Sequence, residues 1–284
     1  MASFTFSQDI ISSSLPKAKL PDGTNMFQWR GFMLSPRLHQ GAMAANKHFS
    51  ACSTGISVTY PKCGTTWLNL KQEKESPNPL LSTGPHDLIP NLELDIYLKD
   101  PIPDITSIPS PRLFSTHLPY SRYILKGPDS DITSIPSPRL FTTHLAYCGC
   151  QIVYYMKKFP LYGFENLSFE ETFERFCEGA LPFGPFFETV LEYWKESKDK
   201  QERIMFLTYE EMIADTKEVV KRVAAFLGRP VEEEKEVEKI VEIAFFRKGV
   251  VGDWMNHFTP EMMERLDHIT QQKLQGSGLE FRFD

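Results

Sequence analysis

The sequence predicts an α/β fold in which a central parallel β-sheet is flanked by helices. A β-branched run at residues 56–59 leads into a turn and then into a segment that can begin a helix. A second buried strand is expected at residues 204–207, with amphipathic helical patterns before and after it. Strands that alternate with helices imply parallel pairing, with helices on both faces of the sheet.

Composition favours a single domain spanning residues 1–284, because 41% hydrophobic residues can fill a sizeable core. The net charge of −6 argues against a nucleic-acid partner. Five cysteines without a regular framework indicate reduced thiols and a cytoplasmic location. Residues 1–20 lack the apolar run of a secretory signal, and no stretch is apolar over the length that spans a membrane. In the N-terminal region we expect four packing anchors, which are Phe27, Trp29, Phe32 and Met33.

Residues 60–67, with the sequence Tyr-Pro-Lys-Cys-Gly-Thr-Thr-Trp, are expected to form a phosphate-binding loop between the first strand and a helix. Gly64 lets the backbone approach the anion, and the helix N-terminus presents N–H groups to it. Lys62 adds positive charge, and two threonines add hydroxyl donors. The spelling is not the Walker form and no magnesium-binding acid accompanies it, so a nucleoside-triphosphate kinase is the weaker interpretation.

An internal repeat occupies the middle of the chain. Residues 104–120 return as residues 131–147, and the copies differ only at Ser115/Thr142 and Pro119/Ala146. One repetition does not make a solenoid, so we interpret it as a tandem duplication of one segment. The next strand is expected at residues 151–155. The nearby pair Cys148 and Cys150 lacks a second Cys/His pair at suitable spacing, and we expect no metal.

The C-terminal half is predicted to be helical from its caps and periodicity. Ser168 and Glu171 form a capping box that opens a helix ending near Glu178. Further helices are expected at residues 186–198, 219–227, 231–243 and 260–275. Gly228 and Gly276 are placed to stop two of them, and Thr259 to cap the last.

Two blocks resemble the signatures of the cytosolic sulfotransferases, which move a sulfonate from 3′-phosphoadenosine 5′-phosphosulfate (PAPS) to a hydroxyl or amine. Residues 60–67 resemble the family's phosphosulfate loop, and residues 246–254 its second signature. The Arg-Lys-Gly part of the second block suits a 3′-phosphate, since arginine binds phosphate with two hydrogen bonds and lysine adds charge. The spelling at residues 78–81, 85–88 and 110–114 is most like the plant branch.

The resemblance implies a P-loop-like sulfotransferase fold and a cofactor site. In the family, the lysine that matches Lys62 contacts the 5′-phosphate and stabilises negative charge on the bridging oxygen as the S–O bond breaks. The matching tryptophan, Trp67, stacks on adenine, and Tyr209 matches a tyrosine at the adenine edge. The other implied contacts are Cys63, Gly64, Thr65 and Thr66 at the 5′-phosphate, and Arg247, Lys248 and Gly249 at the 3′-phosphate.

The resemblance also implies that a histidine in a Thr-His-Leu-Pro setting, at a strand end, deprotonates the acceptor hydroxyl. The imidazole pKa suits this role. His117 matches this setting fully, and His144 matches it except that Ala146 replaces the final proline. Only seven residues separate His144 from Ile152, fewer than a parallel crossover needs. We therefore expect His117 to be the base and the second copy to lie in the crossover.

The chain also departs from the family. The turn that supplies an arginine and a serine to the 3′-phosphate is absent after Tyr155, and a segment is missing before Ala244. Losing one charged phosphate contact typically costs about 1.5–3 kcal/mol. Lys157 or Lys158 is a possible substitute for the arginine. These departures keep a catalytically impaired relative open as the alternative to an active enzyme.

The resemblance finally implies a small hydroxylated acceptor, such as a flavonoid or steroid, and transfer without a metal. Two of the four positions that match the family's dimerisation motif depart from it, which favours a monomer or a weak homodimer. Those four positions are Met255, Thr259, Pro260 and Glu264.

Overall fold

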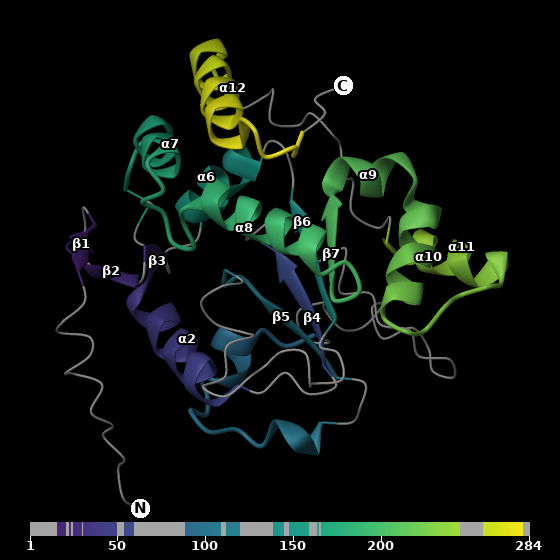
Figure 1. The fold of residues 1–284 in the computed structure, drawn as a ribbon. Helices are drawn as coiled ribbons and strands as arrows, with labels where there is room; N and C mark the ends of the chain where they lie inside the picture. The colour runs from purple at the N-terminus through teal and green to yellow at the C-terminus, as the bar shows by residue number, and fades with distance from the viewer. Residues whose placement is uncertain are drawn as a thin grey trace, which may run out of the picture.

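The computed structural model describes residues 16–20, 23, 25–29, 31–49, 54–59, 89–108, 112–119, 139–144, 148–158, 164, 166–244 and 258–280. Its centre is a parallel sheet of four strands in the order β5-β4-β6-β7, which confirms the predicted fold class. Helices lie around this sheet, with α2 (Pro36–His48) on the β5 side and α10 (Thr216–Phe226) and α11 (Glu234–Ala244) beyond β7 (Figure 1). The strands are β4 (Thr54–Thr59), β5 (Arg112–Thr116), β6 (Arg139–His144) and β7 (Ile204–Thr208).

Both copies of the repeat form strands, and β4 lies between them. Ile56 in β4 pairs with Phe114 of the first copy and with Leu140 of the second. Phe114 corresponds to Phe141 in the repeat, so the second copy pairs one residue out of step with the first. β6 also pairs with β7 and completes the sheet. The expectation that the second copy lies in a crossover is therefore wrong.

The predicted strand at residues 151–155 is also wrong, because these residues belong to helix α6 (Cys148–Lys158). Ile152, Val153 and Met156 are buried on one side of the helix, whereas Tyr154 is exposed. A short apolar run fits either a helix or a strand, and the second copy already fills the place between β4 and β7. The crossover argument for His117 over His144 does not apply to this topology.

The helices predicted from local signals near residues 169–178, 186–198, 219–227, 231–243 and 260–275 are confirmed, whereas two further helices, at residues 36–48 and 209–214, were not predicted. Ser168 makes the capping box at α7, Thr259 caps α12, and Gly228 and Gly276 have φ angles of 76° and 75° after α10 and α12. The helices are α2 (Pro36–His48), α7 (Phe169–Cys177), α8 (Phe186–Asp199), α9 (Tyr209–Ala214), α10 (Thr216–Phe226), α11 (Glu234–Ala244) and α12 (Pro260–Leu274), with two short turns, the π-helix η2 (Leu92–Ile96) and the 3₁₀ helix η3 (Ile105–Ser107).

A small antiparallel sheet precedes the central one and was not predicted. It consists of β1 (Lys17–Lys19), β2 (Asn25–Trp29) and β3 (Phe32–Leu34). Trp29, Phe32 and Met33 are buried as expected, and Phe27 stacks on His39 with ring centroids 4.8 Å apart. This sheet supplies one wall of the main core.

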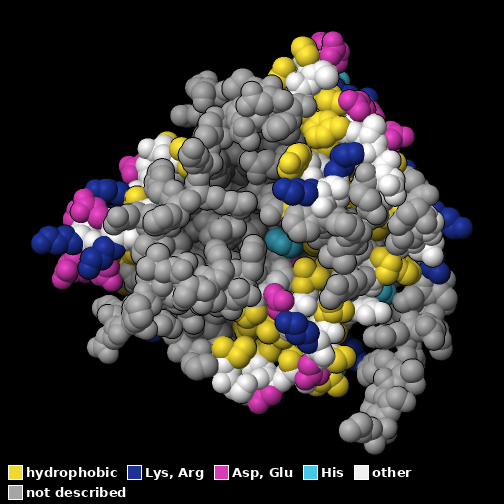
Figure 2. Space-filling model, turned by 180° about the vertical axis from the view of Figure 1, so that it is seen from behind, with side chains coloured by type: hydrophobic (Ala, Val, Ile, Leu, Met, Phe, Trp, Pro, Cys, Tyr) yellow, Lys and Arg dark blue, Asp and Glu magenta, His cyan; other side chains and the backbone are white. Residues whose placement is uncertain are grey.

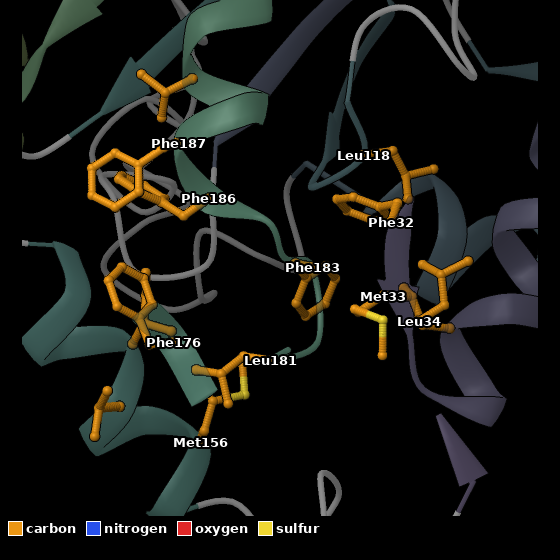
Figure 3. Close-up of a cluster of buried hydrophobic side chains, with 14 of the residues drawn as sticks. Phe32, Met33, Leu34, Leu118, Met156, Phe176, Leu181, Phe183, Phe186 and Phe187 are labelled. Atoms are coloured by element: carbon orange, nitrogen blue, oxygen red, sulfur yellow. The ribbon is translucent and has the colours of Figure 1, made fainter. Parts of the chain in front are cut away.

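The main core joins the N-terminal sheet to the helices above the central sheet. Phe183 lies between the side chains of β3 and the aromatic group of α7 and α8 (Figure 3). The Phe183 N–H donates to the Met33 carbonyl at 2.9 Å, and the Met33 N–H donates to the Gly184 carbonyl at 2.8 Å. The loop before α8 is thus fixed to β3.

The surface over α10 and α11 carries interspersed charges of both signs (Figure 2). Lys217 pairs with Glu234 and Glu238, and Lys221 pairs with Glu234. These pairs are exposed, so each contributes little to stability. Among the described helices, none combines the length and apolar character needed to cross a membrane.

Candidate active site

The carboxyl edge of the central sheet gathers the segments that carry the predicted site. β4 ends at Thr59, directly before the phosphate-loop sequence. β5 ends one residue before His117, β6 ends at His144, and β7 leads into α9, which begins at Tyr209. Ligands of open parallel sheets bind at this edge. The backbone therefore places both histidines beside β4, one on each side.

Most of the predicted cofactor contacts lie outside the described residues. These are Lys62, Cys63, Gly64, Thr65, Thr66, Trp67, Arg247, Lys248 and Gly249. For His144 and Tyr209 the structure describes the backbone. Of the predicted site residues, His117 is the one whose side-chain surroundings are described.

The His117 side chain is half-buried beside an apolar wall. Its ring meets the ring of Phe183 edge-on, with centroids 5.2 Å apart. Phe183 is buried and has a φ angle of 68°, unusual for a residue other than glycine. Leu118, the next residue after His117, is also buried, and its carbonyl accepts a 2.6 Å hydrogen bond from the Tyr193 hydroxyl. No sequence pattern pointed to Phe183 or Tyr193 as residues near the site.

Glu93 is a further site residue that the sequence analysis missed. It lies in η2, is fully buried, and accepts hydrogen bonds from the Thr116 hydroxyl at 2.9 Å and the His117 N–H at 2.8 Å. Burial raises the pKa of its carboxyl to about 7. Leu92, Leu94 and Ile96 alternate with acidic residues, a pattern that would place Glu93 on the polar face of a strand. The π-helix turns it inward instead.

The contacts of Lys157 and Lys158 do not support either lysine as a substitute for the missing arginine. The Lys157 ammonium donates to the Leu167 carbonyl, and the Lys158 Nζ lies 5.8 Å from the centre of the Tyr154 ring. Both side chains are occupied by partners from α6 or the segment before α7. Within the described residues, no group of His, Cys, Asp and Glu side chains has the clustering of a metal site.

Gly41 allows α2 to approach the segment that carries Glu93. A Cβ atom on Gly41 would lie 1.8 Å from the carbonyl oxygen of Glu93. We predict that Gly41→Ala pushes η2 away from α2 and destabilises the fold by about 1–3 kcal/mol, as overpacking does. Urea unfolding measures the loss. Gln40→Ala, at the neighbouring exposed position, is the control and should change stability by less than about 0.5 kcal/mol. Equal stability of Gly41→Ala and wild type would contradict this packing.

Comparison with known proteins identifies the family. A sequence model described as the sulfotransferase domain matches residues 55–126, 150–246 and 239–278. Cytosolic sulfotransferase 5 of Arabidopsis thaliana is 37% identical, over 95% of this chain and 94% of the relative. The chain belongs to the sulfotransferase family. Cytosolic sulfotransferase 8 of the same plant is 36% identical, over 94% of this chain and 91% of that relative.

Solved sulfotransferase structures share the fold. A crystal structure of an Arabidopsis thaliana sulphotransferase superposes with a TM-score of 0.81 at 32% identity, over 96% of this chain and 94% of that one. A mouse sulfotransferase complexed with 3′-phosphoadenosine 5′-phosphate (PAP) gives a TM-score of 0.69 at 22% identity, over 89% of this chain and 95% of that one. At that identity the likeness concerns the fold alone.

The comparisons also bear on the repeat and on the missing segments. The family match covers the first copy and stops at residue 126, and it resumes at residue 150, so the second copy lies outside it. The alignment with cytosolic sulfotransferase 5 extends over 323 positions, whereas this sulfotransferase has 284 residues. That alignment must therefore place gaps within this chain, as expected if internal segments are missing.

Proposed function

We propose that this sulfotransferase transfers a sulfonate group from PAPS to a hydroxyl of a small acceptor in the cytoplasm. Family membership supports the reaction class, and the names of the Arabidopsis relatives support the location. The observation that carries the proposal is the position of His117. It follows β5 at the carboxyl edge, beside the strand that leads into residues 60–67.

In the proposed reaction, the acceptor oxygen attacks sulfur while His117 takes the hydroxyl proton. A new O–S bond forms, and the S–O bond to the 5′-phosphate breaks. The electron pair of that bond stays on the phosphate oxygen, so the departing product is 3′-phosphoadenosine 5′-phosphate (PAP). Lys62 stabilises the negative charge that grows on this oxygen, and the phosphate loop holds the group in line with the acceptor.

His117 is proposed as the base in preference to His144. The first copy lies within the segment that matches the family, and the second copy lies outside it. Described contacts also hold the backbone on both sides of His117, through Thr116 and Leu118. A general base needs such fixed placement, because proton transfer requires hydrogen-bond contact with the hydroxyl.

The side chains near His117 favour an apolar acceptor. Phe183 and Leu118 are buried beside it, and Phe32 and Met33 belong to the same core. An apolar wall with one polar group that fixes orientation is typical of small-molecule sites. A flavonoid or a steroid has this character, since each combines an apolar ring system with a hydroxyl.

The test is a sulfonation assay with ³⁵S-labelled PAPS and a panel of flavonols, sterols and simple phenols. We expect labelled product with at least one apolar hydroxylated acceptor and none with Lys62→Ala at comparable protein concentration. Labelled product is the direct readout of transfer. A folded protein that binds PAP but labels no acceptor would contradict the proposal and support the catalytically impaired alternative.

A further inference from the structure

His117 lies one residue beyond the last residue of β5 that pairs with β4. The register between β4 and β5 ends with Val58 opposite Thr116. The backbone N–H of His117 therefore has its described partner outside the sheet, in the carboxylate of Glu93. At this point a side chain from another element, instead of a neighbouring strand, accepts the backbone hydrogen bond.

Glu93 binds the chain at two points on the N-terminal side of the His117 Cα atom. One carboxylate oxygen accepts from the His117 N–H at 2.8 Å, and the other accepts from the Thr116 hydroxyl at 2.9 Å. The Thr116 hydroxyl oxygen in turn accepts from the Leu118 N–H at 3.1 Å. Hydrogen bonds to a carboxylate are stronger than those between neutral groups. Residues 116, 117 and 118 are thus tied to one buried side chain.

The C-terminal side of this segment is held by α8, and the loop before α8 contacts the imidazole. The buried Tyr193 donates its hydroxyl to the Leu118 carbonyl at 2.6 Å. The Phe183 ring limits the movement of the imidazole from the side. Glu93 and Tyr193 therefore act from two separate elements on the three residues that include His117.

The position of Glu93 is itself determined by close packing. Pro90 and Asn91 run beside β5, where the Ser115 N–H donates to the Pro90 carbonyl at 3.0 Å. The Asn91 side chain caps η2 by accepting from the Leu94 N–H at 2.9 Å. Gly41 lets α2 press against the Glu93 backbone. This arrangement places a carboxylate, rather than an apolar side chain, against the end of β5.

A buried carboxylate is a costly way to fill space. Glu93 is 0% exposed, and its described contacts are hydrogen bonds without a cationic partner. An apolar residue of similar size would avoid the desolvation cost. Such costs concentrate at functional sites. The hydrogen bonds to Thr116 and His117 are the contacts that this carboxylate makes and an apolar side chain could not make.

We propose that Glu93 is a positioning residue that holds His117 in the orientation needed to take the acceptor proton. The proposal rests on the proposed function, because orientation matters only if His117 is the base. Glu93 acts through the backbone of His117 and the hydroxyl of Thr116. A displacement of 1 Å at a reacting group can lower the rate by about 10²-fold.

Two pairs of variants test this role. Glu93→Gln keeps the shape and can accept from the His117 N–H while donating to the Thr116 hydroxyl, whereas Glu93→Met keeps the length and loses both bonds. Thr116→Ser keeps the hydroxyl, whereas Thr116→Val loses it. Asp95→Asn is the matched control, since Asp95 lies in η2 and accepts from the Asn91 N–H but is partly exposed.

We expect Glu93→Met to lower kcat per PAP-binding site by about tenfold or more, with acceptor KM and PAP Kd changed by less than about twofold. Glu93→Gln, Thr116→Ser and Asp95→Asn should stay near wild type, and Thr116→Val should follow Glu93→Met. Hydrogen exchange in the peptide spanning residues 112–119 gives a readout that needs no activity. It should rise in Glu93→Met and Thr116→Val and stay unchanged in Asp95→Asn.

The outcomes separate this proposal from the proposed function. A wild type that yields no sulfonated product refutes the function. An active wild type whose kcat per PAP-binding site is unchanged in Glu93→Met and Thr116→Val refutes the positioning role. Loss of PAP-binding sites alone, with kcat per site preserved, would show a purely structural role and overturn the proposal. If Glu93→Met does not fold, the comparison of Thr116→Val with Thr116→Ser decides.

Discussion

Replacing His117 by alanine should lower kcat for sulfonate transfer by about 10²–10⁴-fold, the contribution typical of a general base. The imidazole lies at the end of β5, so its loss removes the proton acceptor while β5 still pairs with β4. Binding of PAP, measured by calorimetry, should change little, because the expected cofactor contacts lie in residues 62–67, at Tyr209 and in residues 247–249. Steady-state kinetics with labelled PAPS measures the effect.

The duplicated segment supplies its own control for this prediction. His144 ends β6 on the other side of β4, within a copy that differs from the first at only two positions. His144→Ala should retain kcat within about threefold of wild type, since it removes a group outside the proposed proton transfer. Activity that survives in His117→Ala but disappears in His144→Ala would assign the base to the second copy.

Proline at position 142 should unfold the central sheet. Thr142 pairs with Val58 of β4 and with Phe206 of β7, so β6 has a neighbour on each side. Proline cannot donate to either ladder and is excluded from central strands. We expect Thr142→Pro to cost about 3 kcal/mol or more, a large share of the stability of a typical domain. Urea unfolding followed by far-ultraviolet circular dichroism measures this loss.

Thr142→Ser is the control for the proline variant, because it introduces the residue that the first copy carries at the equivalent position, Ser115. It should unfold within about 0.5–1 kcal/mol of wild type. A proline variant as stable as the control would show that the second copy is not part of the sheet.

The helical C-terminal half was predictable because its signals are local. A capping box at Ser168, a cap at Thr259 and stop glycines at 228 and 276 each act within one or two turns of the chain. The antiparallel sheet at the N-terminus depends on pairing between three short segments. Short strands carry little periodic signal of their own, so their partners had to be seen in the structure.

The error at residues 151–155 came from competition between distant segments. Taken alone, the run Ile-Val-Tyr-Tyr suits a buried strand. In a sequence with a single copy of the repeat, the position in the sheet that β6 occupies here would be open to this run. Here β6 pairs with both β4 and β7. Residues 151–155 therefore lie in helix α6, which buries Ile152, Val153 and Met156. Register between strands is a tertiary property, and local propensity does not determine it.

The candidate site divides in the same way. Motif resemblance selected the phosphate loop and the two histidines from the sequence alone. Glu93 and Phe183 contact His117, and Tyr193 contacts the next residue, Leu118; only the fold brings these segments together. The duplicated motif left two candidate bases, and the structure places both beside β4. Activity measurements must therefore separate them.

Calorimetric titration of the purified, folded protein with PAP tests most directly whether this chain is a working sulfotransferase. We predict micromolar or tighter binding, weakened by about 10–100-fold in Lys62→Ala and in Arg247→Ala, as expected for the loss of one charged phosphate contact. That result would show that both phosphate sites function despite the missing segments. A folded protein with no detectable affinity for PAP would contradict the proposal that this chain is a working sulfotransferase.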